Sequence, residues 1–163
     1  MLDIKITNAK TRKTGKELVE IGIENGKITA IAPSVEGEAK QVIDAKGKLV
    51  TESFVNGHLH LCKVYTLEMA GQDALKEYND NNMGGAMTSI ERAADFKACY
   101  DEKWIIENVR KACDLAVKYG NTHIRAFADV DSKARLEGVK GVIRGREEYK
   151  DRLDIQVVAF PQE

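Results

Sequence analysis

Cysteine, proline and long apolar runs are scarce in this chain of 163 residues, which has three cysteines and two prolines. Cys62, Cys99 and Cys113 are odd in number and form no C-x-x-C pair, so the sequence indicates neither a disulfide framework nor a thiolate zinc knuckle. No apolar run approaches the roughly 18–20 residues that span a bilayer, and residues 1–5 lack the basic-then-apolar order of a signal peptide. We therefore expect a cytoplasmic protein that has no membrane partner.

An excess of charge of one sign is also absent. The chain has 25 basic and 26 acidic residues, a balance that points neither to nucleic acid nor to an anionic membrane as a partner. Hydrophobic residues make up 43% of the chain, which is enough for a core. Composition therefore does not indicate the function, and only the residue patterns and motifs can.

The first fifty residues have the pattern of short strands separated by glycine turns. Polar and apolar residues alternate at 3–9 and 18–24, and Asn25-Gly26 is a strong two-residue hairpin signal before a third strand at 27–32. Residues 42–50 add one more turn and strand. We expect a separate β module, in which the alternate apolar residues of the hairpin pack on one face: Val19, Ile21, Ile23, Ile28 and Ile31.

Beyond residue 52, short apolar strands alternate with amphipathic helices. This order is typical of β/α units around a parallel sheet, in which consecutive strands are neighbours. The expected strands cover residues 54–61, 122–129 and 153–160, and the expected helices cover residues 89–99, 102–119 and 132–149. The fold class is therefore expected to be α/β.

Three such strands cannot close a barrel, and the third lies directly before the last residues of the chain. Its outer edge is expected to be unpaired, with Ile155 and Val157 incompletely covered. An open edge of this kind recruits a second copy, giving a homo-oligomer, or a missing C-terminal half. We expect a truncated chain; the alternative is a complete three-stranded α/β domain.

The segment 54–61, Phe-Val-Asn-Gly-His-Leu-His-Leu, contains two of the three histidines. Alternate side chains of a strand share a face, so the rings of His58 and His60 would project the same way from Cα atoms about 6.5–7 Å apart. Two neutral imidazole nitrogens can then converge on one divalent cation, if further ligands arrive from elsewhere. Two alternatives are open: both histidines face water on an edge strand, or they form hydrogen bonds inside a core.

Five segments, taken in order, resemble the amidohydrolase superfamily, and within it cytosine deaminase and the related triazine and ammelide hydrolases. They are Ile-Glu-Asn-Gly-Lys-Ile-Thr-Ala-Ile (23–31), Ile-Asp-Ala-Lys-Gly-Lys-Leu-Val (43–50), the segment with His-Leu-His (54–61), His-Ile-Arg followed by Asp-Val-Asp (123–131), and Asp-Ile-Gln-Val-Val-Ala-Phe-Pro-Gln-Glu (154–163). Together they extend over nearly the whole chain. Their order and spacing are more specific than any single segment.

This resemblance implies a TIM (β/α)8 barrel that carries a small β-sandwich built from both ends of the chain. Residues 1–52 would belong to the sandwich, and residues 53–163 would supply the first three barrel strands. His58 and His60, at the carboxyl end of the first strand, would be ligands of one divalent metal ion, zinc or iron. Gln162 would contact the substrate ring.

The resemblance also implies a reaction, the hydrolytic deamination of a small nitrogenous heterocycle. In the family the other metal ligands and the general acid/base come from later strands, so no catalytic acid or base is expected before residue 163, and the chain alone is expected to be inactive. Two alternatives are a ring-opening hydrolase of cyclic amides from the same superfamily, and a non-catalytic fragment or subunit that needs a separate C-terminal half. The H-x-E and P-C-x-x-C pattern of the nucleic-acid deaminases is absent.

Two residues near the expected site depart from the family pattern. Cys62 stands where many relatives have an aspartate, and Phe127 stands where cytosine deaminases have a second histidine. Both changes lie near the expected pocket. The resemblance therefore does not identify cytosine as the substrate.

Four further polar residues close to these segments have alternative roles. His123 opens the second strand at the non-catalytic end, where a structural role is expected. Asp129 and Asp131 end that strand on the catalytic side, either as site residues or as N-terminal caps of the next helix. Lys63 either reaches the substrate or points into solvent.

Overall fold

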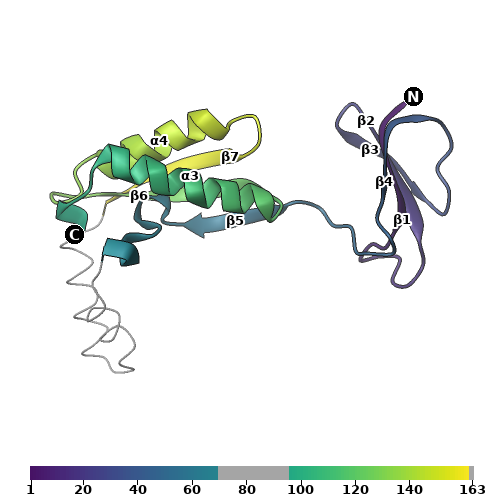
Figure 1. Ribbon diagram of the computed structural model, residues 1–163, viewed down its shortest axis with the longest axis horizontal. Coiled ribbons are helices and arrows are strands. Elements are labelled where there is room, and N and C mark those ends of the chain that lie inside the picture. The colour runs from purple at the N-terminus through teal and green to yellow at the C-terminus, as the bar shows by residue number, and fades with distance from the viewer. Residues whose placement is uncertain (70–95, 162–163) are drawn as a thin grey trace, which may run out of the picture. The chain divides into compact units, whose positions relative to one another are not determined.

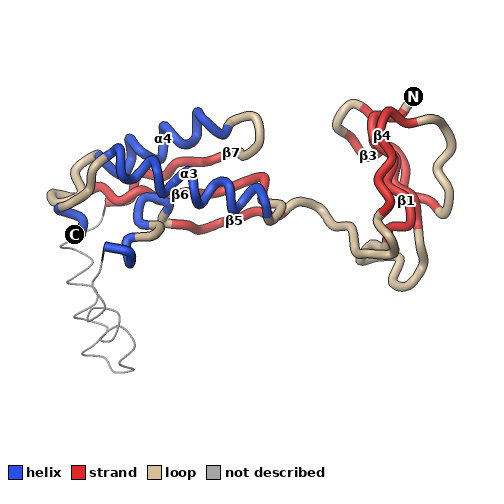
Figure 2. Tube along the Cα trace, viewed as in Figure 1, coloured by secondary structure: helices blue, strands red, loops and turns tan. Residues whose placement is uncertain are grey.

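The computed structural model describes residues 1–69 and 96–161 of the chain. The chain divides into two compact units, Met1–Glu52 and Ser53–Glu163 (Figure 1). Strands form the first unit, and both strands and helices form the second (Figure 2). Within the described residues, no helix is both long and apolar enough to cross a membrane.

The first unit is a four-stranded sheet with the strand order β3-β2-β1-β4. Strands β1, β2 and β3 pair antiparallel in turn, whereas β4 lies parallel to β1. The strand predicted within residues 42–50 ends earlier than expected, because Lys46 and Gly47 both have positive φ angles and form a turn. The strands are β1 (Leu2–Ala9), β2 (Val19–Glu24), β3 (Lys27–Ala32) and β4 (Ala39–Asp44).

The hairpin of β2 and β3 is confirmed. Asn25 and Gly26 have φ angles of 52° and 71°, the left-handed pair that a type I′ turn requires. The register sets Ile21 opposite Ile31, as the alternation predicts. The turn chemistry therefore determines the pairing of these strands.

Burial within this hairpin differs from the prediction. Ile28 and Ile31 are 60% and 52% exposed, because they lie on β3, the edge strand of the sheet. They are therefore not part of the small core of this unit. That core consists of Ala9, Val19 and Ile21, with Ile6, Ile23, Ala45 and Val50 packed at its margin.

The second unit contains a parallel sheet in the order β5-β6-β7, and helices α3 and α4 pack on one of its faces (Figure 1). The parallel direction and the chain order of the strands confirm the prediction, and the fold class is α/β. The elements are β5 (Phe54–Leu59), the 3-10 helices η1 (Leu61–Lys63) and η2 (Thr66–Met69), α3 (Glu102–Lys118), β6 (Asn121–Val130), α4 (Glu137–Tyr149) and β7 (Asp154–Pro161).

One predicted helix begins later than expected, and another lies partly outside the described residues. The helix predicted at 132–149 begins only at Glu137, because a bridge between Asp131 and Arg135 closes a turn before it. Of the helix predicted at 89–99, residues 89–95 lie outside the described residues.

The core of the second unit lies between the sheet and the helices. Alternate residues of β6, namely Ile124, Ala126 and Ala128, are at most 2% exposed. Ile155 of β7 is 1% exposed and belongs to the same core, so the prediction that it would be incompletely covered is wrong. In the described part of the chain, β7 pairs only with β6, and its other edge is open as predicted.

Helices α3 and α4 approach each other closely at glycines of α4. A Cβ atom at Gly141 would lie 2.5 Å from Cγ2 of Ile105, and one at Gly145 would overlap with Val109. Both α3 side chains are completely buried. The packing of the two helices therefore requires glycine at these positions, in spite of its low helix propensity.

We expect Gly141→Ala to lower the free energy of unfolding by about 1–3 kcal/mol, because the overlap with Ile105 outweighs the roughly 1 kcal/mol that alanine adds in helix propensity. Urea unfolding of the whole protein measures the difference. Glu147→Ala, at an exposed position of α4, is the control and is expected to change stability by less than about 0.5 kcal/mol. A stabilised Gly141→Ala variant would contradict the close approach of the helices.

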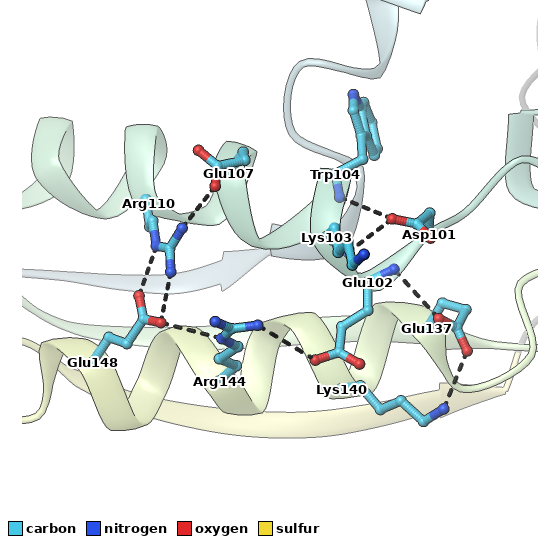
Figure 3. A network of polar contacts seen from close by, with 10 residues as sticks. All are labelled: Asp101, Glu102, Lys103, Trp104, Glu107, Arg110, Glu137, Lys140, Arg144 and Glu148. Carbon is cyan, nitrogen blue, oxygen red and sulfur yellow. Dashed lines mark hydrogen bonds and ion pairs between the residues drawn. The ribbon is translucent and has the colours of Figure 1, made fainter.

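Charged side chains join the outer sides of α3 and α4 (Figure 3). Nε and Nη2 of Arg110 donate to the two carboxylate oxygens of Glu148 at 2.7 and 2.8 Å, and Arg144 donates to the same carboxylate at 3.3 Å. The Arg110 guanidinium holds the pKa of Glu148 below its usual value. The bidentate pair therefore links the two helices most strongly when Glu148 is ionised.

Glu148→Gln is expected to lower the free energy of unfolding by about 0.5–1 kcal/mol near neutral pH, because the pair is partly exposed. The pKa of Glu148 is lower in the folded than in the unfolded chain, so the unfolded chain takes up the proton first as the pH falls. The contribution of the pair is therefore present above about pH 4.5 and lost below it. Unfolding of both proteins across this range tests the pair, and a difference that grows in acid would contradict it.

Candidate metal centre

The His-Leu-His motif lies where β5 ends and η1 begins. β5 stops at Leu59, earlier than predicted, and His60 directly precedes η1. The chain turns here because Leu61 and Cys62 enter the core between sheet and helices, where they are 0% and 1% exposed. The ring centroids of His58 and His60 nevertheless lie 5.2 Å apart. The structure thus brings the two imidazoles together, as the alternation predicts.

Two phenylalanines from the neighbouring strands contact the imidazole rings. Phe127 of β6 stacks on His58 with 4.3 Å between ring centroids, and Phe160 of β7 meets His60 edge-on at 5.2 Å. The two phenylalanine rings are perpendicular to each other at 5.5 Å. Side chains near the carboxyl ends of all three parallel strands therefore form one cluster, and Phe127 contributes an apolar ring that cannot bind a metal.

The side chain of Asp129 is completely buried beside the motif. Its Oδ1 lies 3.1 Å from Nδ1 of His60, and its Oδ2 lies 2.9 Å from Nζ of Lys63 and 3.3 Å from Nζ of Lys97. Asp129 is therefore not a helix cap, and Lys63 directs its ammonium group to a buried carboxylate. Sequence reasoning missed Lys97, because nothing in its local pattern distinguishes it from an exposed lysine.

Lys97 also joins Asp129 to Asp131. Its Nζ lies 2.7 Å from Oδ2 of Asp131, and the residue is 8% exposed. Burial alone would lower the pKa of Lys97, but the carboxylates of Asp131 and Asp129 outweigh it and raise that pKa. The Oδ1 atom of Asp131 accepts the N–H groups of Lys133 and Ala134, so Asp131 caps the turn before α4 and not α4 itself.

The thiol of Cys62 contacts the end of β6. Its Sγ accepts the backbone N–H of Asp129 at 3.3 Å and donates to the carbonyl oxygen of Phe127 at 3.8 Å. Burial raises the pKa of this thiol to about 11, so it is neutral near pH 7. Cys62 therefore acts as a small neutral packing group where the family pattern has an aspartate.

The third histidine lies apart from the other two. His123 is near the start of β6, its side chain is 56% exposed, and its Nδ1 lies 2.8 Å from Oγ1 of Thr122. Asp129, which contacts His60, is near the other end of the same strand. His123 therefore lies at the opposite end of β6 from Asp129, and its structural role stays a prediction.

The described residues include both expected metal ligands, His58 and His60, but no complete metal site. Gln162, which is expected to contact the substrate, lies outside them. Across residues 1–69 and 96–161, no group of three or more His, Cys, Asp or Glu side chains could hold a metal ion. The chemistry of the pair itself fits a divalent cation, because imidazole nitrogens are common metal ligands and Nδ1 of His60 lies 3.1 Å from a buried carboxylate, the partner that metal-binding histidines typically have.

Known proteins are similar to this chain over most of its length. The Amidohydrolase family matches residues 41–163. N-isopropylammelide isopropyl amidohydrolase from Pseudomonas sp. (strain ADP) is 34% identical over 160 residues, which are 98% of this chain and 38% of that protein. An allantoinase from Rubrobacter xylanophilus is 33% identical over 58 residues, which are 36% of this chain and 13% of that protein.

Solved structures have the same fold over this length. The 5-methylcytosine deaminase from Klebsiella pneumoniae liganded with 5-fluorocytosine matches with a TM-score of 0.73 and 25% identity, over 98% of this chain and 37% of that chain. N-isopropylammelide isopropylaminohydrolase from Burkholderia multivorans ATCC 17616 matches in fold, with a TM-score of 0.58 and 24% identity, over 99% of this chain and 38% of that chain. The chain therefore spans less than two fifths of the length of these relatives.

Proposed function

Because the chain belongs to the Amidohydrolase family, we propose that the whole protein hydrolyses a C–N bond of a small nitrogenous heterocycle and releases ammonia or an amine. The observation that carries this proposal is the histidine pair, whose rings lie 5.2 Å apart with Nδ1 of His60 against the buried Asp129. Similarity to the ammelide hydrolase and to the liganded 5-methylcytosine deaminase supports an exocyclic amino group as the leaving group.

We assign the three parallel strands to the start of a TIM barrel, and residues 1–52 to a small β-sandwich that other parts of the protein complete. The parallel direction, the chain order and the similarity to the deaminase structure support this assignment. Active sites of such barrels lie at the carboxyl ends of the strands. The histidine pair at the end of β5 and Asp129 near the end of β6 lie there.

His58 and His60 would hold one divalent cation, zinc or iron, through imidazole nitrogens. A bound cation of this kind would supply a water nucleophile, because it lowers the pKa of its bound water to about 7. Phe127 fixes the ring of His58 by stacking, and Asp129 fixes that of His60 by a hydrogen bond. We expect residues outside these 163 to provide the further ligands and the general acid/base.

Phe127 and Phe160 present aromatic rings beside the imidazoles. A hollow of about 600 Å³ opens on His60 and Lys63, and neither phenylalanine lines it. These features suit a planar heterocycle, which stacks on aromatic rings. A small-molecule heterocycle is therefore the proposed partner, together with a further copy or a C-terminal half that covers the open edge of β7.

An assay of the metal-loaded whole protein tests the proposal. The panel contains cytosines, N-alkylated aminotriazines and cyclic amides such as hydantoins, and both ammonia and amine are measured. We expect release from an exocyclic C–N bond of one of the first two groups. Absence of hydrolysis throughout the panel by protein that contains stoichiometric metal would contradict the proposal.

A ring-opening hydrolase of cyclic amides is the second candidate, because the allantoinase is 33% identical over 58 residues. The product separates the two reactions: ring opening gives a linear carboxylate and releases no ammonia. A non-catalytic subunit is the remaining alternative. It predicts that hydrolysis appears only when the chain is combined with a separately encoded C-terminal half.

A further inference from the structure

One carboxylate in this unit faces three nitrogen groups at once. Oδ2 of Asp129 lies within 3.3 Å of two lysine ammonium groups, whereas Oδ1 faces only Nδ1 of His60, at 3.1 Å. The side chain is completely buried, and its backbone N–H is bonded to the thiol of Cys62. Water therefore does not compete for these oxygens, and the carboxylate has one orientation.

We propose that Asp129 is a positioning residue that holds His60 in the tautomer with the proton on Nδ1. This inference rests on the proposed function, because it gives His60 an unprotonated Nε2 for the metal. A neutral imidazole carries one N–H, so a proton on Nδ1 leaves the lone pair of Nε2 exposed. A carboxylate can only accept, and the hydrogen bond to Oδ1 therefore requires the Nδ1–H form.

The two lysines make the two oxygen positions of Asp129 different from each other. Lys63 and Lys97 form ion pairs with Oδ2, so their positive charges favour an oxygen atom, and not an NH2 group, at that position. Their charges also compensate the buried carboxylate, which would otherwise be costly. A merely structural role, in which Asp129 ties η1 to β6 through the same hydrogen bond, would give the same tautomer but would leave the metal affinity unaffected when that tautomer changes. The tautomer and the metal affinity, measured together in the wild type and in an Asp129 variant, therefore distinguish the two roles.

The first measurement needs no variant. The metal-free whole protein is labelled with ring-15N histidine and studied by NMR at about pH 8, where an ordinary imidazole is neutral. The ring signals of His60 are assigned as those that are absent from the spectrum of the His60→Asn variant. We expect the 15N shifts of His60 to show a protonated Nδ1 and an unprotonated Nε2. The opposite tautomer, or an equal mixture, would overturn the inference.

Asp129→Asn inverts the tautomer without changing the shape of the residue. Because the lysines favour the amide oxygen at the Oδ2 position, the NH2 group takes the place of Oδ1 and donates to Nδ1 of His60. The proton then moves to Nε2, where it blocks the metal. We expect the affinity for Zn²⁺, measured by competition with a chelator, to fall about 10- to 100-fold.

Asp131→Asn is the matched control. Asp131 contacts Lys97 at 2.7 Å, so its replacement perturbs the same lysine network, yet its hydrogen bonds go to Lys97, Lys133 and Ala134. We expect this variant to keep the tautomer of His60 and to bind Zn²⁺ within about threefold of the wild type. An equal loss in both variants would mean that the lysine network alone is responsible, which overturns the positioning role.

The outcomes separate this inference from the proposed function. If the wild type binds Zn²⁺ no more tightly than His60→Asn, the proposed metal site is wrong. If His60→Asn loses the metal but Asp129→Asn retains it with an unchanged tautomer, the metal site stands and the role of Asp129 is wrong.

Discussion

Replacing His60 by asparagine in the whole protein is expected to lower its affinity for Zn²⁺ at least about 100-fold, and its hydrolytic rate with it. The loss of an outer partner of a ligand costs about 10- to 100-fold, and the loss of the ligand itself costs more. His60 is one of two imidazoles whose rings lie 5.2 Å apart, so the variant leaves only His58 of this pair. Chelator competition and metal content after dialysis measure the effect.

His123→Asn is the control for this experiment. His123 is exposed and lies at the other end of β6, so we expect its replacement to leave both metal affinity and rate within about twofold of the wild type. Retention of full metal content by His60→Asn, with the loss found instead in His123→Asn, would contradict the assignment of the site.

The second large effect is expected at Lys97, whose replacement by methionine is predicted to lower the free energy of unfolding by about 3 kcal/mol. Removal of one partner of a buried ion pair leaves an uncompensated buried charge, which typically costs 3–5 kcal/mol. The ammonium group of Lys97 lies 2.7 Å from Asp131 and 3.3 Å from Asp129, and its side chain is 10% exposed. Lys63 remains beside Asp129 and still compensates part of its charge. The expected loss of stability is therefore at the lower end of that range.

Two comparisons test this explanation. Lys140→Met removes an exposed partner of Glu137 and is expected to cost less than about 1 kcal/mol. The double variant Lys97→Met with Asp131→Asn removes both members of the closest pair and is expected to recover part of the loss. A Lys97→Met protein as stable as the wild type in urea would show that this buried pair contributes nothing.

Local chemistry predicts much of this fold. The Asn25-Gly26 turn determines the β2–β3 hairpin, because both residues adopt positive φ angles. The change from strand periodicity to helix periodicity after residue 52 predicts the parallel order of β5, β6 and β7. Alternation also predicts that the rings of His58 and His60 lie together, although the strand ends earlier than expected.

Burial and long-range pairing could not be predicted in the same way. Ile155 is buried because it faces the helices, and Ile31 is exposed because β3 is an edge strand; alternation does not say which face is covered. The contact between His60 and Asp129 joins residues 69 positions apart. No local sequence pattern predicts such a contact. No local pattern distinguishes Lys97 from an exposed lysine either.

The position of the metal is the most direct test of the assignment of His58 and His60 as its ligands. Anomalous X-ray diffraction from crystals of the zinc-loaded whole protein, recorded on both sides of the zinc absorption edge, locates the ion without reference to activity. We expect one strong peak about 2.0–2.1 Å from an imidazole nitrogen of His58 and of His60, with Nδ1 of His60 still hydrogen-bonded to Asp129. A peak elsewhere in the protein, with no peak at these two histidines, would contradict it.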